Sequence, residues 1–265
     1  NHHKGDRDLT IAVEVRKVRE EDFEIQAKDQ QLHYKYGVIL ADNNNKVLGF
    51  AEKPLKEEMS AIGETVLVSM GNYIFHRNPL VWALEQKFGI DFGNHILPGM
   101  VNDNKNVFVY RFNGYWRDVG DIPSYFAACM DLNNENPPID YKRLISEWRP
   151  IITLGGNAAP TKIMRQGKIS TIAEGCEIYG TIENCVLGQN VIVGNGSNLR
   201  NAVVFPEVEI EPGATIQNAI IDKNNIITTG TTLGYDQELD RKRGYTIVPR
   251  GNNYLVVVPR VNPQK

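Results

Sequence analysis

The 265-residue sequence has few of the features that mark several protein classes. Its three cysteines, Cys129, Cys176 and Cys185, are too few and too scattered for a disulfide framework or a zinc site, so we expect reduced thiols in a cytoplasmic protein. No apolar run approaches the roughly 20 residues that span a bilayer. The formal net charge of −3 creates no basic field. We therefore expect neither a membrane nor a nucleic-acid partner.

The first 150 residues alternate between strand-like and helix-like patterns. We predict strands over residues 9–18, 36–42, 46–54, 67–75 and 107–112, and helices over 79–88, 92–101 (broken at Pro98) and 122–135. Residues 19–35 are polar and predict a loop or short helix, and the three asparagines at 43–45 predict a turn between antiparallel strands. The alternation predicts an α/β domain with a mixed sheet over residues 1–150.

Helical periodicity is lost after residue 169, where apolar residues recur every six positions. They are Ile172 and Ile178; Leu187, Val193, Leu199 and Phe205; Val204, Ile210 and Ile216; and Ile221, Ile227 and Leu233, with slips of register between some sets. This period is typical of a parallel β-helix, with an ordinary β-sandwich as the alternative. We predict a linker over 151–168 and a β-helix over 169–265, capped by a strand pair within 242–260.

The predicted β-helix contains no histidine. All five histidines precede it, at His2, His3, His33, His76 and His95. Acyltransferases built on six-residue repeats use a histidine near the coils to deprotonate the acceptor, so a general base of that kind is absent. We therefore expect the β-helix to be structural, regulatory or interfacial, and the chemistry to come from the α/β part.

The stretch AEKP (51–54) places Glu52 and Lys53 side by side at a strand end. Neighbouring residues on a strand face opposite ways, so both reach one ligand only if the strand breaks, which Pro54 favours. Lysine suits a phosphate as a point charge, and glutamate accepts hydrogen bonds from sugar hydroxyls. A solvated strand end is the alternative.

Two further stretches hold candidate ligand-binding residues. Ser69 and Gly71 lie in the apolar strand SMGNYIF (69–75), where the glycine permits close approach of a ligand or close packing. Asp91 opens DFGNHILP (91–98), where it would either cap a short helix or bind a ligand.

The stretch GYWRDVGD (114–121) follows a predicted strand. A carboxylate such as Asp118, on a glycine-flanked loop at a strand end, is a suitable ligand for Mg²⁺. Arg117 would orient Asp118 or balance phosphate charge, and Tyr115 and Trp116 would exclude water and so strengthen each electrostatic contact. A buried pair of Arg117 and Asp118 that locks the loop is the alternative.

Together, these four motifs and the following β-helix resemble the glucose-1-phosphate adenylyltransferases, of the nucleotide-sugar pyrophosphorylase group. WRPI (148–151) and APTK (159–162) are similar to that family's connector, and the resemblance runs from about residue 5 to about residue 245. It implies a partial, Rossmann-like nucleotidyltransferase domain with a mixed α/β sheet, followed by a left-handed parallel β-helix.

The resemblance also implies a reaction and a set of residue roles. ATP and glucose 1-phosphate would give ADP-glucose and pyrophosphate, with Mg²⁺ as the cofactor. Lys53 would hold the sugar phosphate and Asp118 would be one of two metal carboxylates, converging on one hexose-phosphate pocket. The other substrate-binding residues would be Glu52, Ser69, Asp91 and Trp116. A sugar-phosphate or nucleotide effector would meet Lys162, Arg241, Lys242 and Arg243, although a solvated run is the alternative for the last three.

The sequence departs from the family in one large respect. The glycine-rich loop GGxGxRLxPLT, which holds the ATP phosphates, and the second metal aspartate are not found in these 265 residues. We therefore expect an inactive fragment of such an enzyme; the alternatives are a non-catalytic regulatory or assembly subunit and an enzyme for another sugar 1-phosphate. A sheet without its first strands exposes an apolar edge, so we also expect a homo-oligomer.

Overall fold

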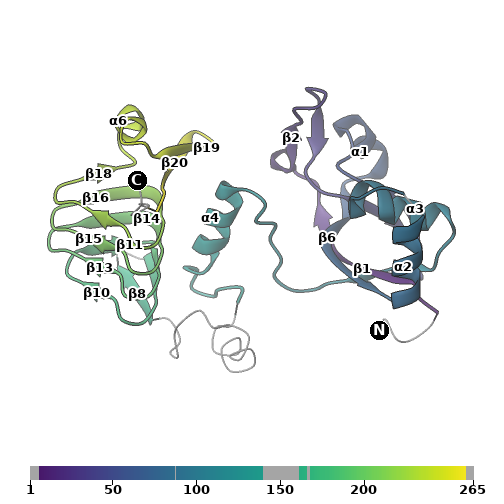
Figure 1. Ribbon diagram of the computed structural model, residues 1–265, viewed down its shortest axis with the longest axis horizontal. Coiled ribbons are helices and arrows are strands. Elements are labelled where there is room, and N and C mark those ends of the chain that lie inside the picture. Colours follow the sequence, from purple (N-terminus) through teal and green to yellow (C-terminus); the bar gives the residue numbers. More distant parts are fainter. Residues whose placement is uncertain (1–5, 87, 140–160, 166–167, 261–265) are drawn as a thin grey trace. The chain divides into compact units, whose positions relative to one another are not determined.

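The computed structural model describes residues 6–86, 88–139, 161–165 and 168–260. They form two compact units that divide between Trp116 and Arg117, the first purple to blue and the second teal to yellow in Figure 1. The predicted limit at residue 150 lies outside the described residues, and the limit at residue 168 directly follows two residues that also lie outside them, so that division stays a prediction. Among the described residues, no helix has the length and apolar character needed to cross a membrane.

Five strands make up the main sheet of the first unit. Their order is β5 (Val47–Ala51), β4 (Val38–Ala41), β6 (Thr65–Phe75), β1 (Leu9–Lys17) and β7 (Val107–Arg111). β1 and β7 run parallel and the other neighbours run antiparallel, which confirms the mixed sheet. Alternate residues of β1, among them Leu9 and Ile11, are fully buried against the helices α2 (Arg77–Glu85) and α3 (Leu97–Asn102).

Several elements of the first unit differ from the predictions. Within residues 19–35, a short 3-10 turn, η1 (Glu20–Asp22), leads into an unpredicted hairpin of β2 (Phe23–Ile25) and β3 (Leu32–Tyr34). Helix α1 (Lys56–Ile62) was also not predicted. Pro98 does not break a helix, because a π-helical turn, η2 (Phe92–Ile96), runs directly into α3 and Pro98 lies in the first turn of α3. Proline is tolerated there, since first-turn N–H groups have no partner within the helix.

The second unit is mainly a β-solenoid, in which short strands of successive coils pair in parallel. One side stacks β10 (Glu177–Ile178), β13 (Ile192–Val193), β15 (Glu209–Ile210) and β17 (Ile226–Ile227). A longer side stacks β9 (Lys168–Ile172), β12 (Val186–Leu187), β14 (Asn198–Val204) and β16 (Thr215–Ile221). β11 (Thr181–Glu183) pairs with β14, β18 (Thr232–Leu233) pairs with β16, and β8 (Thr161–Arg165) pairs antiparallel with β9. This arrangement confirms a β-helix rather than a sandwich.

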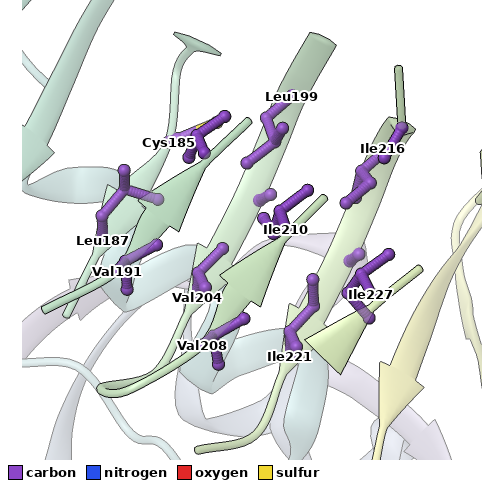
Figure 2. Close-up of a cluster of buried hydrophobic side chains, with 14 of the residues drawn as sticks. Cys185, Leu187, Val191, Leu199, Val204, Val208, Ile210, Ile216, Ile221 and Ile227 are labelled. Atoms are coloured by element: carbon purple, nitrogen blue, oxygen red, sulfur yellow. The ribbon is translucent and has the colours of Figure 1, made fainter. Parts of the chain in front are cut away.

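The side chains inside the coils form one apolar core (Figure 2). Most residues predicted from the six-residue period lie in this core, such as Leu187, Val204 and Ile221, which stack across β12, β14 and β16. The prediction was wrong for Phe205, which is only partly buried and packs on a separate cluster with Phe126. Positions that pair between these coils lie 17 residues apart, one fewer than three sides of six. The shorter coil explains why the predicted register slips.

Asparagines stack at one corner of the solenoid. Asn184 Nδ2 donates to Asn201 Oδ1 at 2.8 Å, and Asn201 Nδ2 donates to Asn218 Oδ1 at 3.4 Å. The three residues have φ angles of 52°, 48° and 47°. Asparagine tolerates this left-handed conformation better than other residues with a Cβ, so the repeated asparagine sets the corner of each coil.

The C-terminal elements cover the last coil. β19 (Thr246–Arg250) and β20 (Asn253–Val258) form the predicted strand pair, and β20 joins the parallel stack beside β16. Helix α6 (Gln237–Lys242) precedes this pair. Helix α4 (Ile122–Asp131) belongs to the same unit, since its fully buried Phe126 packs with Val203, Ile220 and Leu255.

Candidate functional site

The backbone turns sharply where β5 ends. The strand stops at Ala51, and Lys53 adopts a φ of 47°, in the left-handed region. The strand therefore breaks at Glu52 and Lys53, as Pro54 was expected to cause. The backbone N–H of Tyr34 in β3 donates to the carbonyl of Pro54 at 2.8 Å, so the hairpin supports the turn.

The Glu52 side chain lies against two glycine residues, Gly37 and Gly93. A Cβ placed on Gly37 would fall 2.7 Å from Glu52 Oε2, and one placed on Gly93 would fall 2.5 Å from it. Burial raises the pKa of Glu52, Lys53 opposes that shift, and the nearby carboxylate of Asp91 adds to it. The two predicted acids, Glu52 and Asp91, thus share one electrostatic environment.

Ser69 and Tyr73, both on β6, extend the same cluster. Burial raises the pKa of the Tyr73 phenol, a hydrogen bond with the Ser69 side chain opposes the shift, and Glu52 and Asp91 add to it. The Tyr73 ring stacks on Phe92 with centroids 5.8 Å apart. Tyr73 lies within SMGNYIF but was not among the predicted site residues, and an aromatic residue in an apolar strand is equally typical of a core.

Asp91 caps the turn that follows it. Its Oδ1 accepts the backbone N–H of Asn94 at 2.6 Å and the side-chain amide of Asn94 at 3.0 Å. The backbone hydrogen bond is the main reason why the pKa of Asp91 is lowered. The capping role is confirmed, and its predicted contact with a sugar stays a prediction.

The hairpin β2–β3 contributes two residues that the sequence patterns did not single out. Glu24 Oε1 lies 3.5 Å from the ammonium nitrogen of Lys53. His33 Nδ1 lies 2.7 Å from the backbone carbonyl oxygen of Lys53, and its Nε2 lies 2.9 Å from Asp29 Oδ2. The sequence offered little indication of a role for these residues, because they lie in the polar stretch 19–35, which shows no periodic pattern.

Trp116 is the last residue of the first unit, and its ring lies near an aromatic and a cationic side chain. Its ring lies 6.0 Å from that of Tyr36, and the Arg16 guanidinium carbon lies 4.7 Å from the Tyr36 ring and 5.6 Å from the Trp116 ring. These distances are typical of cation–π contacts. Trp116 therefore has a packed setting, and its predicted role beside a substrate stays a prediction.

Asp118 belongs to the second unit, whereas Lys53 belongs to the first. Asp118 is exposed, and its Oδ1 accepts the backbone N–H of Gly120 at 3.0 Å. Arg117 forms an ion pair with Asp131 at 2.8 Å, so the proposed lock between Arg117 and Asp118 was assigned to the wrong acid. The convergence of Asp118 and Lys53 on one pocket stays a prediction.

The predicted effector residues lie in two places. Lys162 is on β8, opposite Thr171 of β9. Arg241 forms an ion pair with Glu238 at 2.9 Å, and Arg243 forms one with Asp240 at 3.4 Å. Two of the three predicted cations at α6 are therefore already paired with acids.

In the part of the chain that the structure describes, no three His, Cys, Asp or Glu side chains group closely enough to hold a metal ion.

Comparisons with known proteins match two parts of the chain to two families. Residues 1–135 match the family described as nucleotidyl transferase, and residues 160–258 match the family described as GlmU-like, C-terminal hexapeptide. Three similar proteins are named glucose-1-phosphate adenylyltransferase. The one from Geobacter metallireducens is 33% identical over 97% of this chain, that from Trichlorobacter lovleyi is 32% identical over 96%, and that from Deinococcus radiodurans is 34% identical over 87%. The alignments cover 64%, 66% and 60% of those relatives, so this chain spans less than two thirds of their length.

Proposed function

The chain belongs to the nucleotidyl transferase family, and from this premise we propose that it carries the sugar-phosphate part of a glucose-1-phosphate adenylyltransferase. Such an enzyme joins ATP and glucose 1-phosphate into ADP-glucose and pyrophosphate. A phosphate oxygen of the sugar attacks the α-phosphorus of ATP, a new P–O bond forms, and pyrophosphate leaves with the electrons of the broken bond. Catalysis then depends on positioning and on charge stabilisation.

The observation that carries this proposal is that Glu52 and Lys53 lie next to each other where β5 breaks. The ammonium of Lys53 would bind the sugar phosphate, and the partly buried carboxylate of Glu52 would accept hydrogen bonds from glucose hydroxyls. Ser69 and Asp91 belong to the same cluster through their interactions with Tyr73 and Glu52. An acid and a cation held side by side suit a ligand that carries both hydroxyls and a phosphate.

Mg²⁺ is the proposed cofactor, with Asp118 as one ligand and Trp116 bordering the substrate. The exposed carboxylate of Asp118 fits a magnesium ion that is held by one carboxylate together with substrate phosphates and water. When bound, the ion neutralises charge on the phosphates. The role of Asp118 on this chain is to accept the Gly120 N–H with Oδ1, which fixes the direction of the carboxylate.

Regulation, assembly and location are the less direct parts of the proposal. An anionic sugar-phosphate or nucleotide effector would meet Lys162 and the cations Arg241, Lys242 and Arg243. Exposed apolar residues on the β4–β5 hairpin, Leu40 and Leu48, favour a homo-oligomer. The three unpaired thiols favour the cytoplasm.

Saturation-transfer NMR on the whole chain tests the proposal. We expect saturation of the glucose ring protons of glucose 1-phosphate, and weaker saturation of mannose 1-phosphate at the same concentration. Equal saturation of the two sugars would favour an enzyme for another sugar 1-phosphate. No saturation of either sugar would favour a non-catalytic subunit and would remove the proposed site.

A further inference from the structure

The hairpin β2–β3 contacts both the backbone carbonyl and the side-chain ammonium of Lys53. Glu24 and His33 are directly opposite in its antiparallel register, so their side chains leave the same face. Glu24 contacts the Lys53 ammonium at 3.5 Å, and His33 Nδ1 contacts the Lys53 carbonyl oxygen at 2.7 Å. The hairpin thereby sets both the backbone and the side chain of the proposed phosphate ligand.

The two partners of the His33 ring are both hydrogen-bond acceptors. The Lys53 carbonyl oxygen faces Nδ1, and a carboxylate oxygen of Asp29 faces Nε2 at 2.9 Å. Neutral imidazole carries a single N–H, whereas imidazolium donates from both nitrogens. Only the protonated ring therefore satisfies both contacts, and His33 is only 5% exposed, so water has little access to replace a lost partner.

We propose that His33 is a positioning residue that holds Lys53 in its left-handed conformation, and that protonation of His33 strengthens binding of the sugar 1-phosphate. This inference rests on the proposed function of Lys53. A left-handed φ is costly for lysine, and the following proline restricts the residue further. A hydrogen bond to the carbonyl of that same residue is the direct means of keeping the conformation.

Loss of one proton would release Lys53 rather than Asp29. A carboxylate is the stronger acceptor, so the remaining proton stays on Nε2 and the Lys53 carbonyl faces a lone pair. The charged groups around the ring are Lys28 and Asp29 in the hairpin turn, Glu24 on β2, and Lys53 after β5. The hydrogen bond to Lys53 is the main cause of a raised pKa for His33; burial opposes it, Asp29 adds to it, and Lys28 slightly lowers it. As pH rises through this raised pKa, the imidazolium form is lost, and the hydrogen bond from His33 to the Lys53 carbonyl is lost with it.

Two substitutions separate the two ring nitrogens. The amide of His33→Asn stands near the position of Nδ1 and keeps a donor for Lys53, whereas the amide of His33→Gln stands near Nε2 and does not. We expect the dissociation constant of glucose 1-phosphate at pH 6 to stay within about twofold of the original for His33→Asn, and to rise about fivefold to tenfold for His33→Gln. Amide spectra of both variants establish that they are folded.

The pH profile supplies a readout that a merely structural role would not move. Between pH 6 and 8.5 the affinity of the original chain for glucose 1-phosphate should fall relative to that of His33→Asn. Because ionisation of the ligand's phosphate affects both proteins equally, a difference between the two profiles reports on His33. His76→Asn, a histidine at the start of α2, serves as the control and should keep the original profile. Parallel profiles for the original chain and His33→Asn, or equal affinities for the two His33 variants, would overturn the inference.

A measurement without ligand separates this inference from the proposed function. In labelled protein, both imidazole nitrogens of His33 should be protonated at pH 6, and the carbonyl resonance of Lys53 should shift as His33 titrates. A Lys53 resonance that ignores that titration would overturn the positioning role. A chain that shows the coupled shift and yet binds no sugar phosphate would count against the proposed function instead.

Discussion

The carboxylate of Glu52 lies over the backbone of Gly93, so that a Cβ on Gly93 would fall 2.5 Å from Glu52 Oε2. Glu52 follows β5, and Gly93 lies in the π-helical turn after Asp91. The observed position of the Glu52 side chain therefore depends on a residue without a Cβ, 41 positions further along the chain.

Gly93→Ala should displace Glu52 with little effect on the fold. The collision is with the far end of a flexible side chain, so we expect the free energy of unfolding to change by no more than about 0.5 kcal/mol. Affinity for glucose 1-phosphate should fall about tenfold, because the carboxylate leaves its position. Gly49→Ala is the control, since its Cβ would make an ordinary contact at 3.6 Å with Leu40. Calorimetric titration that finds equal affinity for both variants would contradict the placement of Glu52.

Glu52→Gln should stabilise the first unit while weakening ligand binding. Burial raises the pKa of Glu52, so the folded chain binds a proton more readily than the unfolded chain, and the ionised carboxylate lowers stability as pH rises through that pKa. The variant should therefore gain in free energy of unfolding at pH 7 relative to pH 4. Urea unfolding at the two values tests this, and an equal gain at both would mean that the carboxylate is not destabilised by burial.

Asn201 should contribute to stability through both its backbone and its side chain. Its φ of 48° disfavours alanine by about 1–2 kcal/mol, and loss of the contacts with Asn184 and Asn218 adds about 1 kcal/mol. Glycine accepts the conformation, so Asn201→Gly should cost about half as much as Asn201→Ala. Thermal unfolding of the two variants measures the split, and equal losses would show that the left-handed conformation is not the cause.

Phe126→Ala should destabilise the second unit alone. The fully buried ring packs on Val203, Ile220 and Leu255 of the solenoid, and removal of such a ring costs about 3–5 kcal/mol. Hydrogen exchange should speed up in β14, β16 and β20 and stay unchanged in β1. Faster exchange throughout both units, or none in the solenoid, would contradict the assignment of α4 to the second unit.

Much of the architecture could be predicted because regular periods carry it. The alternation in β1 and the six-residue period of Leu187, Val193 and Leu199 each bury one face, which leaves a readable pattern. The hairpin β2–β3 left none, since each strand has only three residues, too few to establish a period. Its contacts with Lys53 are made 20 and 29 residues apart in sequence, a separation that no local pattern reveals.

The candidate site could be predicted by residue type but not by partner. Glu52, Ser69 and Asp91 do belong to one cluster in the first unit. The sequence did not indicate that Arg117 pairs with Asp131, 14 residues away, rather than with its neighbour Asp118. Asp131 is the last residue of α4, which brings this distant acid within reach of Arg117.

The most direct test is the affinity of the whole chain for glucose 1-phosphate with and without the ammonium of Lys53. We expect calorimetric titration to show that Lys53→Ala weakens binding at least about tenfold, since a charge-assisted hydrogen bond to phosphate is lost. Lys46→Ala, just before β5, should leave the affinity unchanged. Equal affinities for the original chain and Lys53→Ala would contradict the central claim that this lysine holds the sugar phosphate.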